Sequence, residues 1–169
     1  MTRVASAPGA LLVALLALLA AACASLELRP DLSQLEFELN GRLAANARDD
    51  SFTGSLNWRH ARAADDLVIR TPLGQGVARL VRQGDAVELA TAEGRIHRAT
   101  DAEALTERVL GFRLPIEGLA DWVRGRPAPA LEARGWKIEY QEYDSERRPV
   151  RMRLTYPGIE LRLAISEWK

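Results

Sequence analysis

The feature that most constrains the fold is an alternation of apolar and polar residues that recurs in short stretches along most of the chain. In the first stretch, Phe37, Leu39 and Leu43 share one face, while Glu38 and Arg42 share the other. Successive side chains of a β-strand point to opposite faces, so this period indicates a strand with one buried face. The predicted strands are 37–45, 52–58, 67–71, 77–82, 87–90, 95–98, 136–140, 150–156 and 159–165.

The connections between most of these stretches are short. Residues 46–51 are polar, and the connections 83–85 and 93–94 each contain a glycine. Such connections are typical of antiparallel neighbours in a sheet. Asp65 and Asp66 come directly before the third stretch, and we expect them to form a further turn.

The period changes to that of a helix between residues 100 and 127. Thr100 and Glu103 have the spacing of a capping box, which predicts a helix that Gly111 would end. Pro115 favours the start of a second helix, and Gly125 favours its end. The apolar residues at helical spacing are Ala102, Leu105, Val109 and Leu110 in the first helix and Ile116, Leu119, Trp122 and Val123 in the second.

The order of these elements predicts a mainly β fold with some helix. About six antiparallel strands are followed by two amphipathic helices, a link rich in proline and alanine, and three more strands. A single sheet with one apolar face, and only short helices to cover it, indicates a curved sheet or open barrel with the helices across its mouth. Periodicity does not decide whether the interior is filled or hollow.

The start of the chain has the layout of a secretory signal. A charge at Arg3 precedes an apolar run that begins at Gly9 and leads into Cys23. The run is short for a permanent membrane span, which needs about 20 residues. A membrane-spanning or core helix that happens to end in cysteine is the alternative.

Taken as a signal, this start divides the chain into three parts. We expect a signal peptide at residues 1–22, a lipidated tether at 23–30, and a single domain at 31–169. Asp31 could cap a brief helix start at residues 31–36. No later stretch is long and apolar enough to span a membrane, so attachment would depend on the lipid.

Cys23 is the only cysteine, so the chain cannot form an internal disulfide. Leu19–Cys23 resembles the lipobox of bacterial lipoproteins, in which the cysteine is acylated and becomes the mature N-terminus. The match departs from the usual motif at Ala20, where leucine is common. By the same resemblance, Ala24 and Ser25 lack the aspartate associated with retention in the inner membrane. The implied location is the periplasmic face of the outer membrane of a Gram-negative cell.

The charged and nucleophilic residues give no sign of an enzyme. Lys+Arg and Asp+Glu are both 23, so there is no basic excess for nucleic acid. His60 and His97 lack the partners of a metal site, and no nucleophile motif is present. We therefore expect no catalytic residue, no metal and no cofactor. An exported hydrolase with an unrecognised site is the weakest of the alternatives.

Three arginines, Arg151, Arg153 and Arg162, are predicted to form a charged stripe on one outer face of the last strands. The simple interpretation is solubility and cross-strand pairing with Glu160. The other interpretation is a surface on which a partner docks.

The connection between the third and fourth strands, residues 71–76, contains one apolar side chain at its tip. Leu73 lies there between Pro72 and Gly74. Loop tips lie on the surface, so we expect Leu73 to be exposed. A single exposed leucine is ordinary and does not by itself indicate a function.

Several motifs occur in the order found in a known family. The most specific are the Pro-Leu-Gly loop at 72–74 and a Leu-Pro-x-x-x-Leu-x-x-Trp stretch at 114–122. The chain is similar to the LolB family of outer-membrane receptors in bacterial lipoprotein localisation. Further matching stretches are Gly41-Arg42-Leu43-Ala44, Phe52 to Trp58, Asp101-Ala102-Glu103, Gly135 to Tyr140 and Leu161 to Trp168.

The resemblance implies an unclosed antiparallel β-barrel with two or three short helices as a lid, of the LolA/LolB kind. It implies an apolar cavity that takes the acyl chains of lipoproteins from the periplasmic carrier LolA and releases them into outer-membrane phospholipid. It also implies that Leu73, with Pro72 and Gly74, enters the membrane, without any cofactor. We expect a monomer that binds no nucleic acid.

The candidate lining of the cavity combines strand and helix residues, and a plain packed core is the alternative for each of them. A structural or assembly lipoprotein that acts as a docking module, without lipid transfer, is the runner-up function. The candidate lining residues are Leu43, Leu56, Trp58, Ile69, Leu114, Ile116, Leu119, Trp122 and Val123.

Overall fold

A computed structural model describes residues 27–47 and 50–169. Its strands form one nine-stranded antiparallel sheet in the order β6-β5-β4-β3-β2-β1-β9-β8-β7. The strands before the helices are β1 (Leu35–Ala47), β2 (Asp50–Ala61), β3 (Ala64–Arg70), β4 (Gly76–Gln83), β5 (Ala86–Thr91) and β6 (Ile96–Ala99). The strands after them are β7 (Lys137–Tyr143), β8 (Pro149–Tyr156) and β9 (Ile159–Trp168).

The sheet is unclosed, as expected. The last strand, β9, pairs with the first, β1, and leaves β6 and β7 as the two edges. The register of β1 against β9 shifts between Asn40 and Gly41. A Cβ atom at Gly41 would lie 2.4 Å from the carbonyl oxygen of Ala164, so glycine permits the close approach of the strands at this irregularity.

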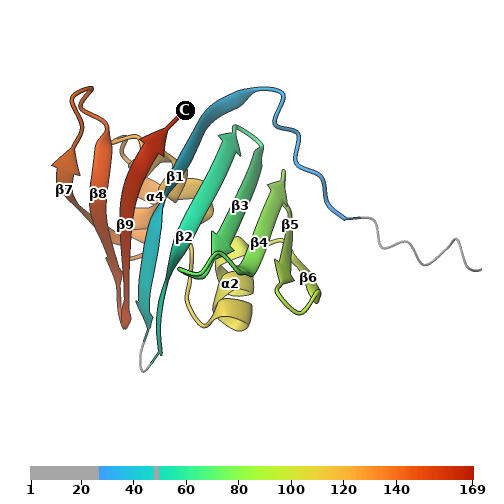
Figure 1. Ribbon diagram of the computed structural model, residues 1–169. Coiled ribbons are helices and arrows are strands. Elements are labelled where there is room, and N and C mark those ends of the chain that lie inside the picture. Colours follow the sequence, from blue (N-terminus) through green and yellow to red (C-terminus); the bar gives the residue numbers. More distant parts are fainter. Residues whose placement is uncertain (1–26, 48–49) are drawn as a thin grey trace, which may run out of the picture.

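In the described part of the chain, three short helices lie on one side of the sheet, which curves around them in Figure 1. They are α2 (Ala102–Leu110), α3 (Ile116–Trp122) and α4 (Pro129–Ala133). The predicted capping residue was wrong by one position. The N-cap of α2 is Asp101, whose side chain accepts a hydrogen bond from the backbone N–H of Ala104. Gly111 ends α2 with φ 80°, as expected.

The segment predicted to be a link contains α4. A proline in the first turn and an alanine-rich sequence favour this helix. Backbone N–H groups in the first turn have no acceptor within the helix, so a proline there loses no hydrogen bond. The sequence pattern missed it because the helix has only 5 residues and therefore shows no full apolar repeat.

Two local predictions were wrong. Residues 31–36 form no helix: 31–34 make a turn, in which the Asp31 carboxylate accepts a hydrogen bond from the Ser33 N–H, and β1 begins at Leu35. Asp65 and Asp66 do not form a turn, because both lie inside β3 and are buried. Arginine side chains and ring nitrogens supply the hydrogen bonds that let a strand bury these two carboxylates.

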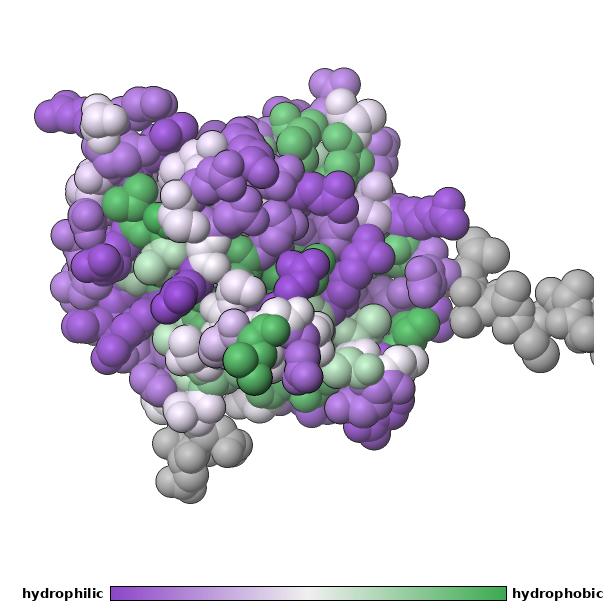
Figure 2. Space-filling view, viewed as in Figure 1, coloured by the Kyte–Doolittle hydropathy of each residue, from purple (hydrophilic) through white to green (hydrophobic). Residues whose placement is uncertain are grey.

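The two faces of the sheet differ in chemistry. The face toward the helices carries the apolar residues of each strand, which join residues of all three helices in one core cluster. The opposite face is mostly hydrophilic, with small separate apolar patches, as Figure 2 shows. In the part of the chain that the structure describes, no helix is long and apolar enough to cross a bilayer.

Candidate functional site

The residues predicted to line a cavity lie together between the sheet and the helices. Leu43, Leu56, Trp58 and Ile69 project from β1, β2 and β3 toward the helices, and each is at most 3% exposed. Buried apolar side chains at this position stabilise the sheet by removing apolar surface from water.

The helix side supplies the other half of the same cluster. Leu114 precedes α3, and Ile116, Leu119 and Trp122 lie within it, followed by Val123. Each is at most 3% exposed, and all belong to the cluster that contains the strand residues. The structure therefore brings the predicted residues together in a closed apolar interior, and their role as an acyl-chain lining stays a prediction.

Close packing holds the helices of the lid to each other. A Cβ atom at Gly118 in α3 would lie 2.2 Å from Cγ of Leu131 in α4, so only glycine allows these helices to pack so closely. Leu131 is fully buried. The N–H of Leu114 donates to Oγ1 of Thr106 at 3.0 Å and fixes the segment between α2 and α3.

Few polar contacts join the lid to the sheet. The Tyr140 hydroxyl of β7 donates to the carbonyl of Trp122 at 3.0 Å. Arg124, just after α3, forms an ion pair with Glu36 of β1 and lies 5.3 Å from the ring centre of Phe37. The hydrogen bond from Arg124 lowers the pKa of Glu36 below its ordinary value. The Arg124–Glu36 ion pair, which we call the seam, joins the segment after α3 to the first strand.

A buried polar cluster lies at one end of the interior. Asp65 is fully buried and accepts hydrogen bonds from Nε1 of Trp58 at 2.7 Å and Nε of Arg82 at 2.6 Å. Nδ1 of His60 lies 2.7 Å from the same carboxylate. Each member of the cluster is paired, so the group can sit beside the apolar residues without an unsatisfied charge.

Sequence reasoning missed this cluster, although a signal was present. Asp65 has the same strand parity as Leu67 and Ile69, and His60 has the parity of Trp58. Period two therefore assigned these polar side chains to the buried face. The pair of aspartates favours a turn in isolation, and this local preference led to the wrong prediction.

Asp66, the next residue, points to the opposite face of the sheet. It forms ion pairs with Arg59 of β2 and Arg79 of β4, the latter at 2.9 Å between Nε and Oδ1. Burial raises the pKa of Asp66, but hydrogen bonds from Arg79 and Arg59 outweigh burial and lower the pKa below its ordinary value.

The connection between β3 and β4 is a tight hydrogen-bonded turn. The N–H of Gly74 donates to the carbonyl of Thr71 at 2.9 Å, which places Pro72 and Leu73 at the two central positions. Gly74 has φ 83°, a conformation that side chains disfavour. The N–H of Gln75 also donates to Oγ1 of Thr71 at 3.2 Å. Leu73 is 88% exposed, as its place in the chain predicted, and its role in insertion stays a prediction.

The arginine stripe on the last strands is paired with acidic residues. Arg153 and Arg162 both contact Glu160, at 3.5 Å and 2.6 Å between nitrogen and oxygen. Arg151 contacts Glu142 at 3.3 Å. These contacts favour the simple interpretation of the stripe, cross-strand pairing, over a dedicated docking surface.

The remaining candidates concern metal and lipid attachment. Among residues 27–47 and 50–169, no group of three or more His, Cys, Asp or Glu side chains is placed to hold a metal ion. Cys23 lies outside the described residues, so its acylation stays a prediction.

Comparison with known families narrows the functions left open by the sequence. A family model described as "Outer membrane lipoprotein LolB" matches residues 35–168. The chain belongs to the LolB family. This membership confirms the resemblance drawn from the motifs and favours the lipoprotein-receptor function over a hydrolase.

Relatives in this family are similar over most of their length. An outer-membrane lipoprotein LolB of Thiobacillus denitrificans is 36% identical over 146 residues, which cover 78% of each chain. One from Chromobacterium violaceum is 34% identical over 173 residues, covering 91% of this LolB-family chain and 95% of its own.

A solved structure supports the fold. A LolA superfamily protein from Nitrosomonas europaea aligns with a TM-score of 0.51 at 13% identity, over 81% of this chain and 86% of that one. At that identity the similarity concerns the fold alone. It confirms the unclosed sheet with short covering helices that the motifs implied.

Proposed function

We propose that this LolB-family chain is a receptor that accepts acylated lipoproteins from a periplasmic LolA carrier and releases them into the outer membrane. The observation that carries the proposal is the apolar interior shared by the inner face of the sheet and the helix lid. Acyl chains exposed to water cost about 0.8 kcal/mol per methylene, so a transfer protein must keep them covered.

In this proposal the interior opens when the lid moves away from the sheet. The lid helices have 9, 7 and 5 residues, lengths at which helices depend on packing for their stability. Displacement of the lid, with Leu119 and Trp122, would free apolar surface of the shared core for an acyl chain. The seam at Glu36 and Arg124 would then be a polar contact that such a movement has to break.

Leu73 is assigned the membrane step. Its hydrogen-bonded turn holds an apolar side chain in water, where burial in the fold does not stabilise it. A leucine at this position would be stabilised by entering a bilayer. We propose that it does so together with Pro72 and Gly74, while a client leaves the interior.

Anchoring is assigned to the N-terminus. We propose that residues 1–22 are a signal peptide, that Cys23 is acylated, that 23–30 tether the lipid, and that 31–169 are a single domain acting as a monomer. The N–H groups of Leu28 and Asp31 bond to Glu88 and Gln83, so the end of this tether lies against β5 and β4. Fractionation tests the anchor: a Cys23→Ala protein that stays with the outer membrane would contradict it.

Leu73→Glu tests the transfer function. We expect the variant to take an acylated client from the carrier but to fail to deliver it into phospholipid vesicles, which flotation of the client measures. Leu73→Ile is the matched control and should deliver normally. Delivery by the glutamate variant would show that the turn has no role in insertion.

Uptake needs its own measurement. A fluorescent apolar probe should bind the protein saturably and be displaced by an acylated client, because both would occupy the same interior. Absence of saturable binding would favour a packed core and the runner-up function, a docking module without lipid transfer.

A further inference from the structure

One row of side chains crosses the outer face of the sheet and carries an arginine on every second strand. The strand registers place Arg151 beside Ala164, Ala164 beside Arg42, Arg42 beside Ser55, and Ser55 beside Arg70. Directly paired residues on neighbouring strands point to the same face. These residues therefore form a single row across β8, β9, β1, β2 and β3, which we call the arginine row.

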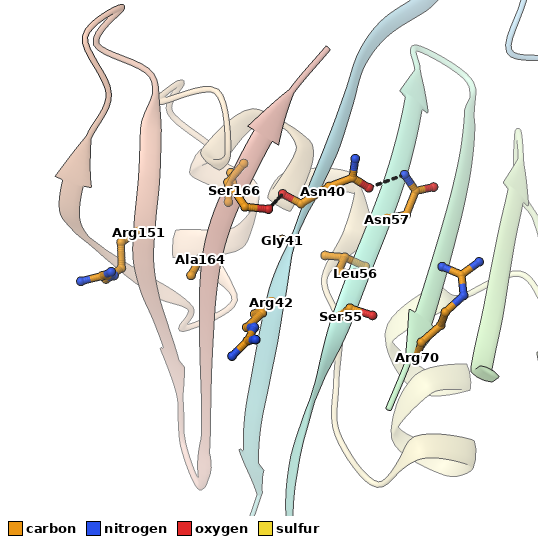
Figure 3. Close-up of a pocket in the computed structure, with 11 residues that line it drawn as sticks. Asn40, Gly41, Arg42, Ser55, Leu56, Asn57, Arg70, Arg151, Ala164 and Ser166 are labelled. Atoms are coloured by element: carbon orange, nitrogen blue, oxygen red, sulfur yellow. Dashed lines mark hydrogen bonds between the residues drawn. The ribbon is translucent and has the colours of Figure 1, made fainter. Parts of the chain in front are cut away.

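The small residues between the arginines open a groove. Neighbouring strands lie about 4.8 Å apart, so arginines on alternate strands stand about 10 Å apart at the backbone. The groove has a volume of about 500 Å³ and is lined by the whole row. Figure 3 shows Arg42, Arg70 and Arg151 spread across it, with the short side chains of Ser55 and Ala164 between them.

Two of these arginines carry an uncompensated charge. In the described part of the chain, Arg42 and Arg70 have no carboxylate within ion-pair distance, although both are exposed. Arg151 contacts Glu142, but that pair is more than half exposed and weak. Arg42 points away from the core, and among the described residues no ion pair accounts for it.

The arginine row ends at the turn that carries Leu73. Arg70 is the last residue of β3 and pairs with Gly76, the first residue of β4, so the two flank the turn. In Figure 1 this turn crosses in front of β2, on the side of the sheet away from the helices. The exposed leucine and the uncompensated arginines therefore lie on one side of the molecule.

We propose that the arginine row binds the phosphates of anionic phospholipid headgroups when Leu73 enters the bilayer. This inference rests on the proposed function of the turn. An inserted leucine brings the nearby surface to headgroup level, where each arginine near an anionic membrane strengthens binding about fivefold. The planar guanidinium also matches phosphate oxygens with two hydrogen bonds. An acidic protein surface would match the charge, but it gives no reason for the exposed leucine beside the row.

The experiment measures how much of the turn is inserted into the bilayer. Gln75 is exposed two residues after Leu73, and Cys23 is the only native cysteine, so Gln75→Cys offers a labelling site once Cys23 is acylated. The acylated protein, carrying an environment-sensitive fluorophore at position 75, is reconstituted into vesicles. One set contains phosphatidylcholine alone, and the other has one fifth of it replaced by phosphatidylglycerol. Client delivery from the carrier is measured in the same vesicles.

We expect phosphatidylglycerol to raise the fraction of turn inserted at least about fivefold, and high salt to reverse the rise. The Arg42→Gln, Arg70→Gln, Arg151→Gln triple variant should lose this rise and keep the insertion and delivery seen with phosphatidylcholine. A control with Arg62→Gln, Arg108→Gln and Arg147→Gln removes the same charge from exposed positions elsewhere and should behave like the unchanged protein.

Two results would overturn the proposal and leave the proposed function standing. One is a triple variant that keeps the full response to phosphatidylglycerol. The other is a triple variant that loses delivery even into phosphatidylcholine, which would assign the row to the protein carrier. Failure of the proposed function looks different, because the unchanged protein would then deliver no client to either kind of vesicle.

Discussion

Two consecutive aspartates of β3 point to opposite faces of the sheet and have different surroundings. Asp65 points inward, where Trp58 and Arg82 enclose it. Asp66 points outward and is held by Arg59 and Arg79, whose side chains are about half exposed (43% and 45%). On the inner face both Asp65 and its partner Arg82 are buried, whereas on the outer face the arginines that pair with the buried Asp66 reach water. The inner face therefore stays apolar around a closed polar cluster, while the outer face presents charge to solvent.

The largest expected effect breaks the inner cluster. Asp65→Asn should lower the free energy of unfolding by about 3 to 5 kcal/mol, because it leaves the buried Arg82 without its counter-charge. Asp66→Asn is the matched change on the outer face and should cost about 1 to 2 kcal/mol, since its arginines can reach water. Urea denaturation measures both, and equal losses would contradict the proposed difference between the faces.

A pair of leucines sharpens the same comparison. Leu119→Ala removes a side chain that is 3% exposed and should cost about 2 to 5 kcal/mol. Leu73→Ala removes one that is 88% exposed and should change stability by less than about 0.5 kcal/mol. Thermal unfolding distinguishes them. A large loss from Leu73→Ala would mean that the turn packs on the fold and is not free to enter a membrane.

The contact between α3 and α4 gives a smaller effect. Gly118→Ala forces a methyl group against Leu131 and should cost about 1 to 3 kcal/mol through overpacking. Adding Leu131→Ala makes room for that methyl group, so the double variant should be more stable than the sum of the single losses predicts. Strict additivity in a double-mutant cycle would show that the two side chains do not meet.

The smallest effect depends on pH. The pKa of Asp66 is lowered in the folded protein, so its contribution to stability is present above the ordinary value of 3.8 and is lost as the pH falls through the folded value. Between about pH 5 and pH 3, the unchanged protein should therefore lose more stability than Asp66→Asn. Parallel acid titrations that lose stability equally would remove this role for Asp66.

Much of the fold followed from the sequence because period two is a direct consequence of strand geometry. The predicted strands match all nine in the structure to within a few residues, and the stops at Gly111 and Gly125 lie where the glycines adopt positive φ. Errors arose where local preference and tertiary contacts disagree. An aspartate pair favours a turn in isolation, but Arg82 and Arg79 come from another strand and make burial in β3 possible.

The sequence by itself determined the strand pattern, the exposed place of Leu73 and the family to which the chain belongs. Only the tertiary structure decided which polar residues are buried, how closely α3 and α4 pack, and which arginines share a row. The physical reason is the distance along the chain over which each effect acts. Alternation and turn chemistry act between residues close in the chain, whereas burial and register depend on strands that pair across the whole sequence, as β1 does with β9.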